Sequence, residues 1–307
     1  MVHSSFCAIV GRFLSVGKTL HFPQDRSVGK LHDLGDISLP SLEEPATALD
    51  ARGTIVVKEA NLLKLEISRD ASQDLYFLEN LGTEDLTFLE LSETLVSDAE
   101  LEHLRGLAGL SSLSLGRTKI TDRGLDHLSA LTGLHHLDLR ETLITDMGAS
   151  GLDRFATLHS LDLSFTSVTN ATLMSLRNLR ELNTLYLNYT PVTDDGVAYL
   201  CDLPELVTLG LEGIDILGAG ITALSCLKDL HMLLLSHTAL DDKHLKFLKF
   251  LTGLNELHLE YTRISSSALS ELRECRSLEY LYVEGCPIDP VVWDELTRQM
   301  QGLTVYT

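Results

Sequence analysis

One pattern, repeated every 24 residues, limits what this chain can fold into more than any other feature of its sequence. The clearest copy, LSSLSLGRTKITDRGLDHLSALTG, begins at Leu110. Self-similarity at a fixed period of this length indicates a solenoid, in which each unit packs against its neighbours. Copies begin in the same frame, without insertion, at Leu86, Leu110, Leu134, Leu158, Leu182, Leu206, Leu230, Leu254 and Leu278.

The spacing of residue types within each copy predicts a strand followed by a short helix. Leucines at positions 4 and 6 alternate with the period of a strand, which leaves positions 3, 5, 7 and 8 facing outward. Threonine recurs at position 9, where its hydroxyl can bond loop backbone that would otherwise be buried unsatisfied. A Thr-Asp pair at positions 12 and 13 predicts a helix N-cap, and leucines at positions 16, 19 and 22 form the inward stripe of the helix.

These units, of which ITDRGLDHLSAL at 120–131 is typical, resemble leucine-rich repeats of the ITDxGLxxL type. Repeats of that type occur in bacterial repeat proteins and in the repeat arrays of F-box proteins. The resemblance covers about residues 62–302. It implies an α/β leucine-rich-repeat solenoid, a curved horseshoe with a parallel β-sheet on the concave face and short helices on the convex face.

We divide the chain into five parts on this frame. A flexible tail at 1–20 precedes an N-terminal cap at 21–61, with β structure around 54–57, and a degraded first repeat at 62–85. Eight regular repeats occupy 86–277, and the last repeat and a C-terminal cap occupy 278–307. In that cap, Trp293, Leu296 and Met300 predict a longer amphipathic helix, and Leu303 and Val305 predict a final strand. Caps are expected because the end units of a solenoid otherwise expose their core.

One unit, at 206–229, departs from the pattern. Ile214 replaces the threonine of position 9, and Leu217-Gly218 replace the Thr-Asp pair. Two interpretations stay open at this point. The unit is either a drifted copy that still packs through its leucines or a softer joint in the curve.

Composition excludes several classes of partner. A formal net charge of -20, from 44 acidic and 24 basic residues, argues against nucleic acid and anionic membrane surfaces. No run approaches the roughly 20 apolar residues of a membrane span. Five cysteines without a CxxC motif fit a reducing compartment, so we expect a non-secretory tail and a cytoplasmic protein. Cys201, Cys226 and Cys275 are expected to fill core or near-core positions as small apolar residues.

The sequence contains no recognisable catalytic motif. HExxH, GxSxG, a glycine-rich phosphate loop and a run with zinc-ligand spacing are all absent from it. His135 and His159 share position 2 and should stack one unit apart, roughly 5 Å from each other. Solvated surface histidines and a two-histidine metal site are both compatible with that spacing. We expect no catalytic residue, cofactor or metal, and keep an enzyme with an unrecognised metal site as an alternative.

The outward positions are not determined by the core, so their residues carry information about binding. Five of the eight tyrosines fall on them, where uniform scatter would place about one. Tyrosine is favoured at interfaces, although aromatic residues also suit strands for structural reasons. The predicted partner-binding residues are Phe165, Tyr186, Tyr189, Met232, Leu234, His237, His258, Glu260, Tyr261, Tyr280, Tyr282 and Glu284.

These observations predict a non-catalytic protein-protein interaction module that acts as a monomer. We expect its concave face to bind a protein or peptide partner with basic character, because Glu and Asp outnumber Arg there. An adaptor that recruits a protein to an enzyme such as a ubiquitin ligase is the alternative. An adaptor would need a second exposed docking surface, and none is visible in the sequence of the tail or caps.

Overall fold

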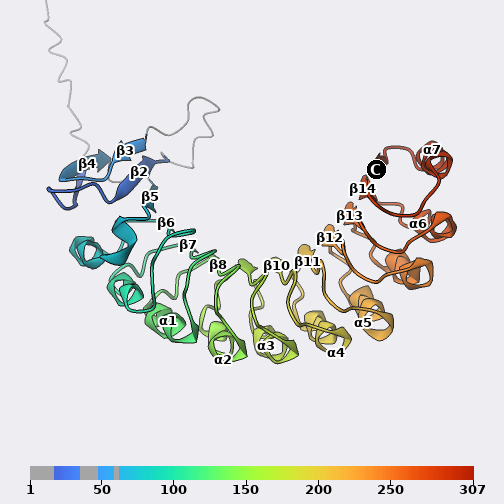
Figure 1. The fold of residues 1–307 in the computed structure, drawn as a ribbon, viewed down its shortest axis with the longest axis horizontal. Helices are drawn as coiled ribbons and strands as arrows, with labels where there is room; N and C mark the ends of the chain where they lie inside the picture. Colours follow the sequence, from blue (N-terminus) through green and yellow to red (C-terminus); the bar gives the residue numbers. More distant parts are fainter. Residues whose placement is uncertain (1–16, 35–47, 59–61) are drawn as a thin grey trace, which may run out of the picture.

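A computed structural model describes residues 17–34, 48–58 and 62–307 and shows an arc-shaped solenoid (Figure 1). A 13-stranded sheet lines the inner side of the arc, and short helical turns lie along its outer side (Figure 1). From β5 to β15 the strands are parallel and follow one another in chain order. The predicted architecture, a parallel sheet on the concave face with short helices outside it, is confirmed.

Strand pairing between units keeps a fixed register. Leu113 pairs with Leu137, and Leu137 with Leu161, so each residue lies beside the residue 24 positions further along. Equal positions in successive units therefore form columns along the arc. The strands are β5 (Leu63–Ile67), β6 (Phe88–Glu90), β7 (Ser112–Ser114), β8 (His136–Asp138), β9 (Ser160–Asp162), β10 (Thr184–Tyr186), β11 (Thr208–Gly210), β12 (Met232–Leu234), β13 (Glu256–His258), β14 (Tyr280–Tyr282) and β15 (Thr304–Tyr306).

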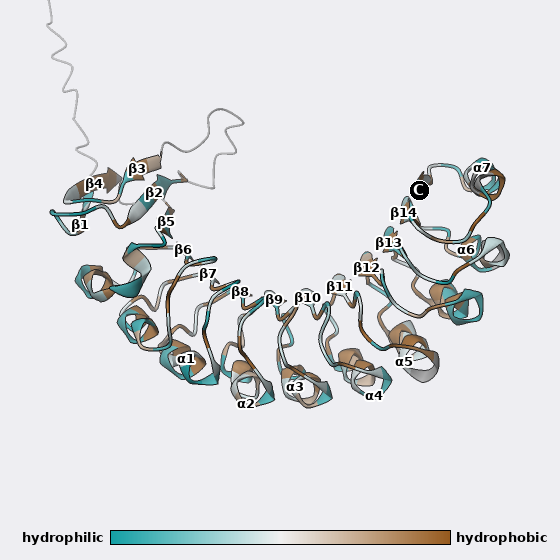
Figure 2. Ribbon diagram, viewed as in Figure 1, coloured by the Kyte–Doolittle hydropathy of each residue, from teal (hydrophilic) through white to brown (hydrophobic). Residues whose placement is uncertain are grey.

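The convex side consists of short α- and 3-10 helices, hydrophobic toward the strands and hydrophilic outside (Figure 2). The leucines of positions 1, 4, 6, 16, 19 and 22 fill the space between the two layers and are almost completely buried. The α-helices are α1 (Asp122–His127), α2 (Asp146–Ala149), α3 (Asn170–Leu176), α4 (Asp194–Val197), α5 (Gly218–Ala223), α6 (Leu269–Leu272) and α7 (Pro290–Gln299). The 3-10 helices are η1 (Ala71–Gln73), η2 (Tyr76–Asn80), η3 (Glu100–Leu104), η4 (Leu128–Ala130), η5 (Leu152–Arg154), η6 (Ala198–Asp202), η7 (Leu224–Cys226), η8 (Asp242–Phe250) and η9 (Ser266–Ala268).

The threonines of position 9 bond loop backbone, as predicted. Thr118 Oγ1 donates to the carbonyl of Leu115 at 2.6 Å, and Thr142 Oγ1 donates to that of Leu139 at 2.6 Å. Both threonines are buried, so each bond satisfies a carbonyl that water cannot reach.

The Thr-Asp pair does more than the predicted capping. Thr145 Oγ1 accepts a hydrogen bond from the Met147 N–H at 3.2 Å, which confirms the N-cap. Asp122 reaches forward to the next unit, where its carboxylate accepts from the Thr145 N–H at 2.8 Å and from Thr145 Oγ1 at 2.7 Å. Asp98, Asp146 and Asp242 make equivalent bonds. Position 13 therefore ties adjacent units together on the convex side.

The unit at 206–229 interrupts this network of bonds between units. Leu217 keeps a backbone bond to Asp194 Oδ1 at 2.6 Å but has no hydroxyl to add. Gly218 carries no side chain that could reach forward to the next unit. There the N–H of Asp241 donates instead to Nδ1 of His244 at 3.2 Å. The core continues unbroken, since Ile214 is buried.

The expectation that all three convex cysteines are small apolar core residues is wrong for two of them. Cys201 and Cys226 are exposed and form a disulfide, with their Cα atoms 5.7 Å apart. They occupy positions 20 and 21 of adjacent units, which point outward from η6 and η7 and face each other across the joint. Cys275 is buried as expected, and burial raises the pKa of its thiol to about 12.

Caps close both ends of the sheet. At the N-terminal end β1 (Gly17–His21) pairs with β4 (Thr54–Lys58), and β2 (Gly29–Asp33) joins β5 to β3 (Ala48–Asp50). Residues 17–20, which the sequence analysis placed in the tail, thus belong to a strand, and tail residues 1–16 lie outside the described residues. At the other end α7 buries Leu296, and β15 completes the sheet. Within the described ranges, no helix is both long and apolar enough to cross a membrane.

Candidate functional site

Position 8 of the nine units from 86 onward forms a column along one edge of the sheet, and its backbone conformation is unusual. All nine residues of this position-8 column have positive φ, although only two of them are glycine. The other seven have φ between 53° and 60°, the left-handed region that glycine favours. The column consists of Glu93, Arg117, Glu141, Phe165, Tyr189, Gly213, His237, Tyr261 and Gly285.

Hydrogen bonds between units hold this conformation. The N–H of Tyr189 donates to the carbonyl of Glu212 at 2.7 Å, and that of His237 donates to the carbonyl of Glu260 at 2.8 Å. Equivalent bonds run from the other column residues as far as Tyr261. A left-handed conformation disfavours a non-glycine residue by roughly 1–2 kcal/mol. The network imposes the conformation, and most units nevertheless keep a side chain at this position.

In the second half of the column those side chains are aromatic and stacked. The ring centroids of Phe165 and Tyr189 lie 4.6 Å apart with planes 14° from parallel, and those of His237 and Tyr261 lie 4.7 Å apart at 10°. Between the two pairs, Tyr189 and His237 are 6.2 Å apart across the unit of Gly213. The result is a row of exposed rings along the edge of the sheet.

Tyrosine rings pack against the two glycines of the column. A Cβ atom added at Gly213 would lie 2.4 Å from Cδ1 of Tyr189, and one added at Gly285 would lie 2.5 Å from Cδ1 of Tyr261. Each ring therefore lies against the glycine backbone of the following unit. This packing holds the two tyrosines in place before any partner arrives, which reduces the entropy lost on binding.

A second aromatic stack occupies position 5, near the C-terminal end of the sheet. His258 and Tyr282 stack with centroids 4.0 Å apart, and Tyr282 and Tyr306 stack at 4.4 Å. Tyr306 is missing from the predicted binding residues. Its signal was present in the sequence, because it follows Tyr282 by one period of 24 residues.

Carboxylates surround His258. Its Nε2 lies 2.8 Å from Glu256 Oε1, and its Nδ1 lies 3.3 Å from Glu260 Oε1. Ser236 Oγ donates to the other oxygen of Glu260. These contacts fix the orientation of the imidazole between two acidic side chains on the concave face.

The first half of the concave face pairs its charges internally. We define the N-terminal concave face as positions 3, 5, 7 and 8 of the units beginning at 62, 86, 110 and 134. Its outward residues include five Asp or Glu and four Lys or Arg. Arg117 bridges Glu93 at 2.9 Å and Glu141 at 2.7 Å. Further ion pairs join Lys64 to Glu90 at 3.5 Å and Arg140 to Asp138 at 3.5 Å.

The second half lacks such internal cations. We define the C-terminal concave face as the same positions of the units beginning at 158, 182, 206, 230, 254 and 278. It carries four glutamates, Asp162 and no Lys or Arg. Glu256 and Glu260 contact His258, and Glu284 accepts from Tyr261 Oη at 2.7 Å. For the half-buried carboxylate of Glu212, the described residues supply no hydrogen-bond donor and no ion-pair partner.

The pKa shifts of two half-buried glutamates express the same difference. Burial raises the pKa of Glu212, and the charge of Glu260 raises it further. Burial acts in the same direction on Glu90, but hydrogen bonds from Ser92 and the charge of Lys64 outweigh it and lower that pKa. Glu212 is therefore a carboxylate whose ionised form the free protein does not stabilise.

The structure brings the twelve predicted binding residues onto one surface. All are exposed or half-buried, and they occupy positions 3, 5, 7 and 8 over strands β9 to β14. Met232 and Leu234 add apolar surface beside Glu256 and His258, with which they pair in register. Sequence reasoning left Glu212 and Glu256 out of the binding set, although both stand at outward positions of the frame.

The predicted stacking of His135 and His159 is confirmed, with ring centroids 5.0 Å apart. Nδ1 of His159 bonds the carbonyl of Thr157 at 2.8 Å, and Nδ1 of His135 lies 3.2 Å from Ser111 Oγ. Across 17–34, 48–58 and 62–307, no group of three or more His, Cys, Asp or Glu side chains is arranged to hold a metal ion. The histidine pair thus has no third ligand among these residues.

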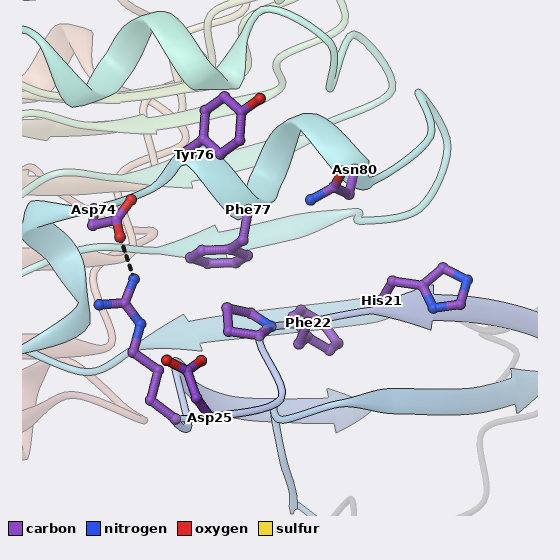
Figure 3. Close-up of a pocket in the computed structure, with 9 residues that line it drawn as sticks. His21, Phe22, Asp25, Asp74, Tyr76, Phe77 and Asn80 are labelled. Carbon is purple, nitrogen blue, oxygen red and sulfur yellow. Dashed lines mark hydrogen bonds and ion pairs between the residues drawn. The ribbon is translucent and has the colours of Figure 1, made fainter.

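A cavity of about 560 Å³ lies away from the concave aromatic residues, between the N-terminal cap and the first helical turns (Figure 3). Phe22 and Phe77, with centroids 6.2 Å apart, form its apolar wall. An ion pair between Arg26 and Asp74 lies at one side of the cavity (Figure 3). Tyr76 is largely exposed near its opening.

Comparison with solved structures identifies the fold. An internalin from Listeria monocytogenes matches with a TM-score of 0.56 and 17% identity, over 82% of this chain and 89% of the internalin. A leucine-rich-repeat protein of Leptospira interrogans matches with a TM-score of 0.57 and 20% identity, over 79% of this chain and 57% of that protein. The mouse RP105/MD-1 complex matches with a TM-score of 0.55 and 22% identity, over 74% of this chain and 39% of the other.

No protein-family model matches the sequence, and no curated protein does. At these identities the structural likeness shows the fold alone. The fold is a leucine-rich-repeat solenoid of the α/β type.

Proposed function

We propose that this protein is a non-catalytic protein-interaction module whose C-terminal concave face binds a partner protein or peptide. The observation that carries the proposal is the aromatic part of the position-8 column. Phe165, Tyr189, His237 and Tyr261 all keep left-handed backbone conformations, while Gly213 and Gly285 show that the same position accepts glycine. Backbone strain kept where a relaxed residue would fit is a pointer to function.

The exposure and rigidity of these residues support binding. Phe165 and Tyr261 are about half exposed, at 51% and 50%, although their large rings lie in fixed stacks. Rigid aromatic side chains of this kind dominate the energetics of protein interfaces because little conformational entropy is lost when they are covered. The stacks leave ring edges available to a partner.

The comparisons agree with a binding role without specifying it. One of the similar structures is the mouse RP105/MD-1 complex, which supports a protein as the partner. For the present chain we propose a partner with basic character and a monomeric protein. The repeat type, ITDxGLxxL, and its link to F-box arrays also remain proposals drawn from the sequence.

The disulfide between Cys201 and Cys226 provides evidence about the compartment in which the protein is located. The cysteine count predicts a cytoplasmic location, but a disulfide is stable mainly in oxidising compartments. In a reducing cytoplasm these two cysteines would be thiols for most of the time. Thiol counting on protein isolated under acid quench decides between the two locations.

The adaptor alternative gains one specific observation. An adaptor needs a second docking surface. The cavity between Phe22 and Phe77 (Figure 3) lies at the N-terminal end of the arc, and strands β12 to β14 of the C-terminal concave face lie at the other end (Figure 1). If the protein is an adaptor, we propose that cavity as the second surface. Retention of some partners after loss of the aromatic column would favour this alternative.

The main proposal is tested by affinity capture from the native lysate with three matched baits. These are the natural protein, the Tyr189→Ala/Tyr261→Ala variant, and Arg117→Ala/Glu141→Ala as a control in the same column. We expect the natural protein and the control to retain the same partner and the aromatic variant to lose it. Each large aromatic anchor typically contributes about 2 kcal/mol or more, so the double change lowers affinity by about a thousandfold.

Circular dichroism and the unfolding midpoint should show that all three baits are folded. Equal capture by the aromatic variant and the natural protein contradicts the proposal. Loss of capture with the control alone would move the binding surface to the N-terminal concave face.

A further inference from the structure

We infer that Glu212 and Glu260 bind Arg or Lys side chains of an extended, basic segment of the partner, which runs along the C-terminal concave face. The inference rests on the proposed function and specifies its ligand.

The two halves of the concave face differ in whether the chain itself supplies cations to their acidic side chains. On the N-terminal concave face the acidic side chains have cations supplied by the chain itself, as Arg117 does for Glu93 and Glu141. The C-terminal concave face keeps four glutamates on the same backbone frame without any Lys or Arg. Charge complementarity therefore favours a partner that supplies the missing cations.

Two carboxylates of the C-terminal concave face, those of Glu212 and Glu260, influence each other. Glu212 and Glu260 stand at position 7 of units two apart, and the charge of Glu260 disfavours ionisation of Glu212. His237 and His258 act in the opposite direction but do not cancel the effect of burial. A cationic side chain placed between the two glutamates would stabilise both ionised forms.

The packing of the rings disfavours recognition of the cation by the tyrosine faces. One face of each tyrosine is covered by its stacked neighbour, Phe165 or His237, and the other lies against the backbone of Gly213 or Gly285, so a partner meets mainly ring edges there. Ring edges carry the positive part of the aromatic quadrupole and do not attract cations. Cations are thus directed to the carboxylates, while the ring edges and Met232 contact apolar side chains of the same segment.

The distance from Phe165 to Tyr261 determines how many residues the bound segment needs. Neighbouring parallel strands are about 4.8 Å apart, so the four steps from Phe165 to Tyr261 span about 19 Å. An extended chain advances about 3.3 Å per residue and covers that distance with roughly six residues. A short segment with two or more basic residues is sufficient to contact the whole surface.

The experiment is selection from a display library of random peptides about ten residues long, which exceeds the ~6 residues of the surface. The baits are the natural protein, Glu212→Gln/Glu260→Gln and, as a matched charge control, Glu93→Gln/Glu141→Gln. We expect peptides rich in Arg and Lys with the natural protein and the control. Individual peptides should bind the Glu212→Gln/Glu260→Gln variant about tenfold or more weakly, with affinity that falls as salt is added.

Selected peptides without enrichment in basic residues, or no selected peptides, overturn the inference. So does undiminished binding to the Glu212→Gln/Glu260→Gln variant. These results leave the proposed function standing, provided that capture from the lysate still depends on Tyr189 and Tyr261. Failure of that capture would instead remove the proposed function itself.

Discussion

The two halves of the concave face share one backbone frame and differ in how their charged groups are satisfied. On the N-terminal concave face, Arg117, Lys64 and Arg140 pair with acidic neighbours. On the C-terminal concave face, glutamates stand beside aromatic rings without Lys or Arg. A surface whose groups are mutually satisfied gains little from a partner. One with uncompensated carboxylates and fixed, exposed rings gains more, which is why we place binding in the second half.

The position-8 column shows the change from one half to the other most directly. Its conformation is left-handed from Glu93 to Gly285, and each unit as far as that of Tyr261 makes the same bond to the next. Its side chains pass from an ion-pair ladder, ending at Glu141, to stacked rings, beginning at Phe165. The scaffold is constant along the arc, and the chemistry displayed on it changes between two adjacent units.

The convex side also changes, within the second half. Regular units are joined by Asp-to-Thr bonds such as Asp122 to Thr145, and the unit at 206–229 lacks part of this network. The disulfide between Cys201 and Cys226 spans the joint into that unit. We interpret it as a covalent replacement for the hydroxyl bond that Leu217 cannot make to Asp194, in place of the softer joint considered from the sequence.

Removing the disulfide should have the largest effect on stability. The bond closes a sequence separation of 25 residues, for which chain entropy gives a stabilisation of about 3.5 kcal/mol. We expect the free energy of unfolding of the Cys201→Ser/Cys226→Ser variant, measured with urea, to be lower by that amount. Amide hydrogen exchange should rise in the units around the joint and remain unchanged near β6 and β7, where the Asp-to-Thr bonds are intact.

Reductant provides the control for this prediction. Dithiothreitol should lower the stability of the natural protein to that of the variant and leave the variant unaffected. Equal stability with and without reductant, in protein shown to contain the disulfide, would mean that the joint is held by packing alone.

Much of the fold was predictable because the repeat fixes it. The periodic leucines determine the sheet, the helices and the core, and α7 and β15 formed where Leu296 and Val305 predicted them. The position-9 hydroxyl bonds and the Thr145 cap also followed from residue type and position. These features depend on contacts that recur in every unit, so one unit contains the information.

What escaped prediction depends on contacts between particular units. The disulfide partner of Cys201 depends on which side chains face each other across a single joint between units. Composition does not reveal which residues these are. The left-handed φ of Phe165 has no signature in its residue type, which normally avoids this region. The packing of Tyr189 against Gly213 was likewise not visible, because both lie at outward positions whose conformation the pattern leaves open.

Replacing Phe165 tests whether the aromatic column opposes the local backbone preference. At its φ of 56°, glycine is favoured over alanine by about 1 kcal/mol. We therefore expect Phe165→Gly to be more stable than Phe165→Ala in urea unfolding. The matched pair is Tyr280→Gly and Tyr280→Ala in strand β14, where glycine should be the less stable residue. The same order at both positions would show that the column is unstrained.

The smallest expected effect compares Glu212 with Glu90 as pH changes. The folded-state pKa of Glu212 is raised, so the folded chain holds its proton more tightly, and stability falls as pH rises from the ordinary value through the raised one. The pKa of Glu90 is lowered, so its ionised form stabilises the fold above the ordinary value, and this is lost as pH falls through the lowered one. Substitution by glutamine should therefore change the free energy of unfolding in opposite directions at Glu212 and at Glu90.

At pH 7 we expect Glu212→Gln to raise the unfolding midpoint and Glu90→Gln to lower it, each by about 2 °C or less, because both side chains are partly solvated. Below the lowered pKa of Glu90 both differences should disappear, since each glutamate is then protonated in either state. Thermal unfolding of the two variants and the natural protein across this pH range measures the effect. If Glu212→Gln lowered the midpoint at pH 7, the carboxylate would already be stabilised within the free protein. The contrast between the two faces, and with it the need for a cation from the partner, would then be lost.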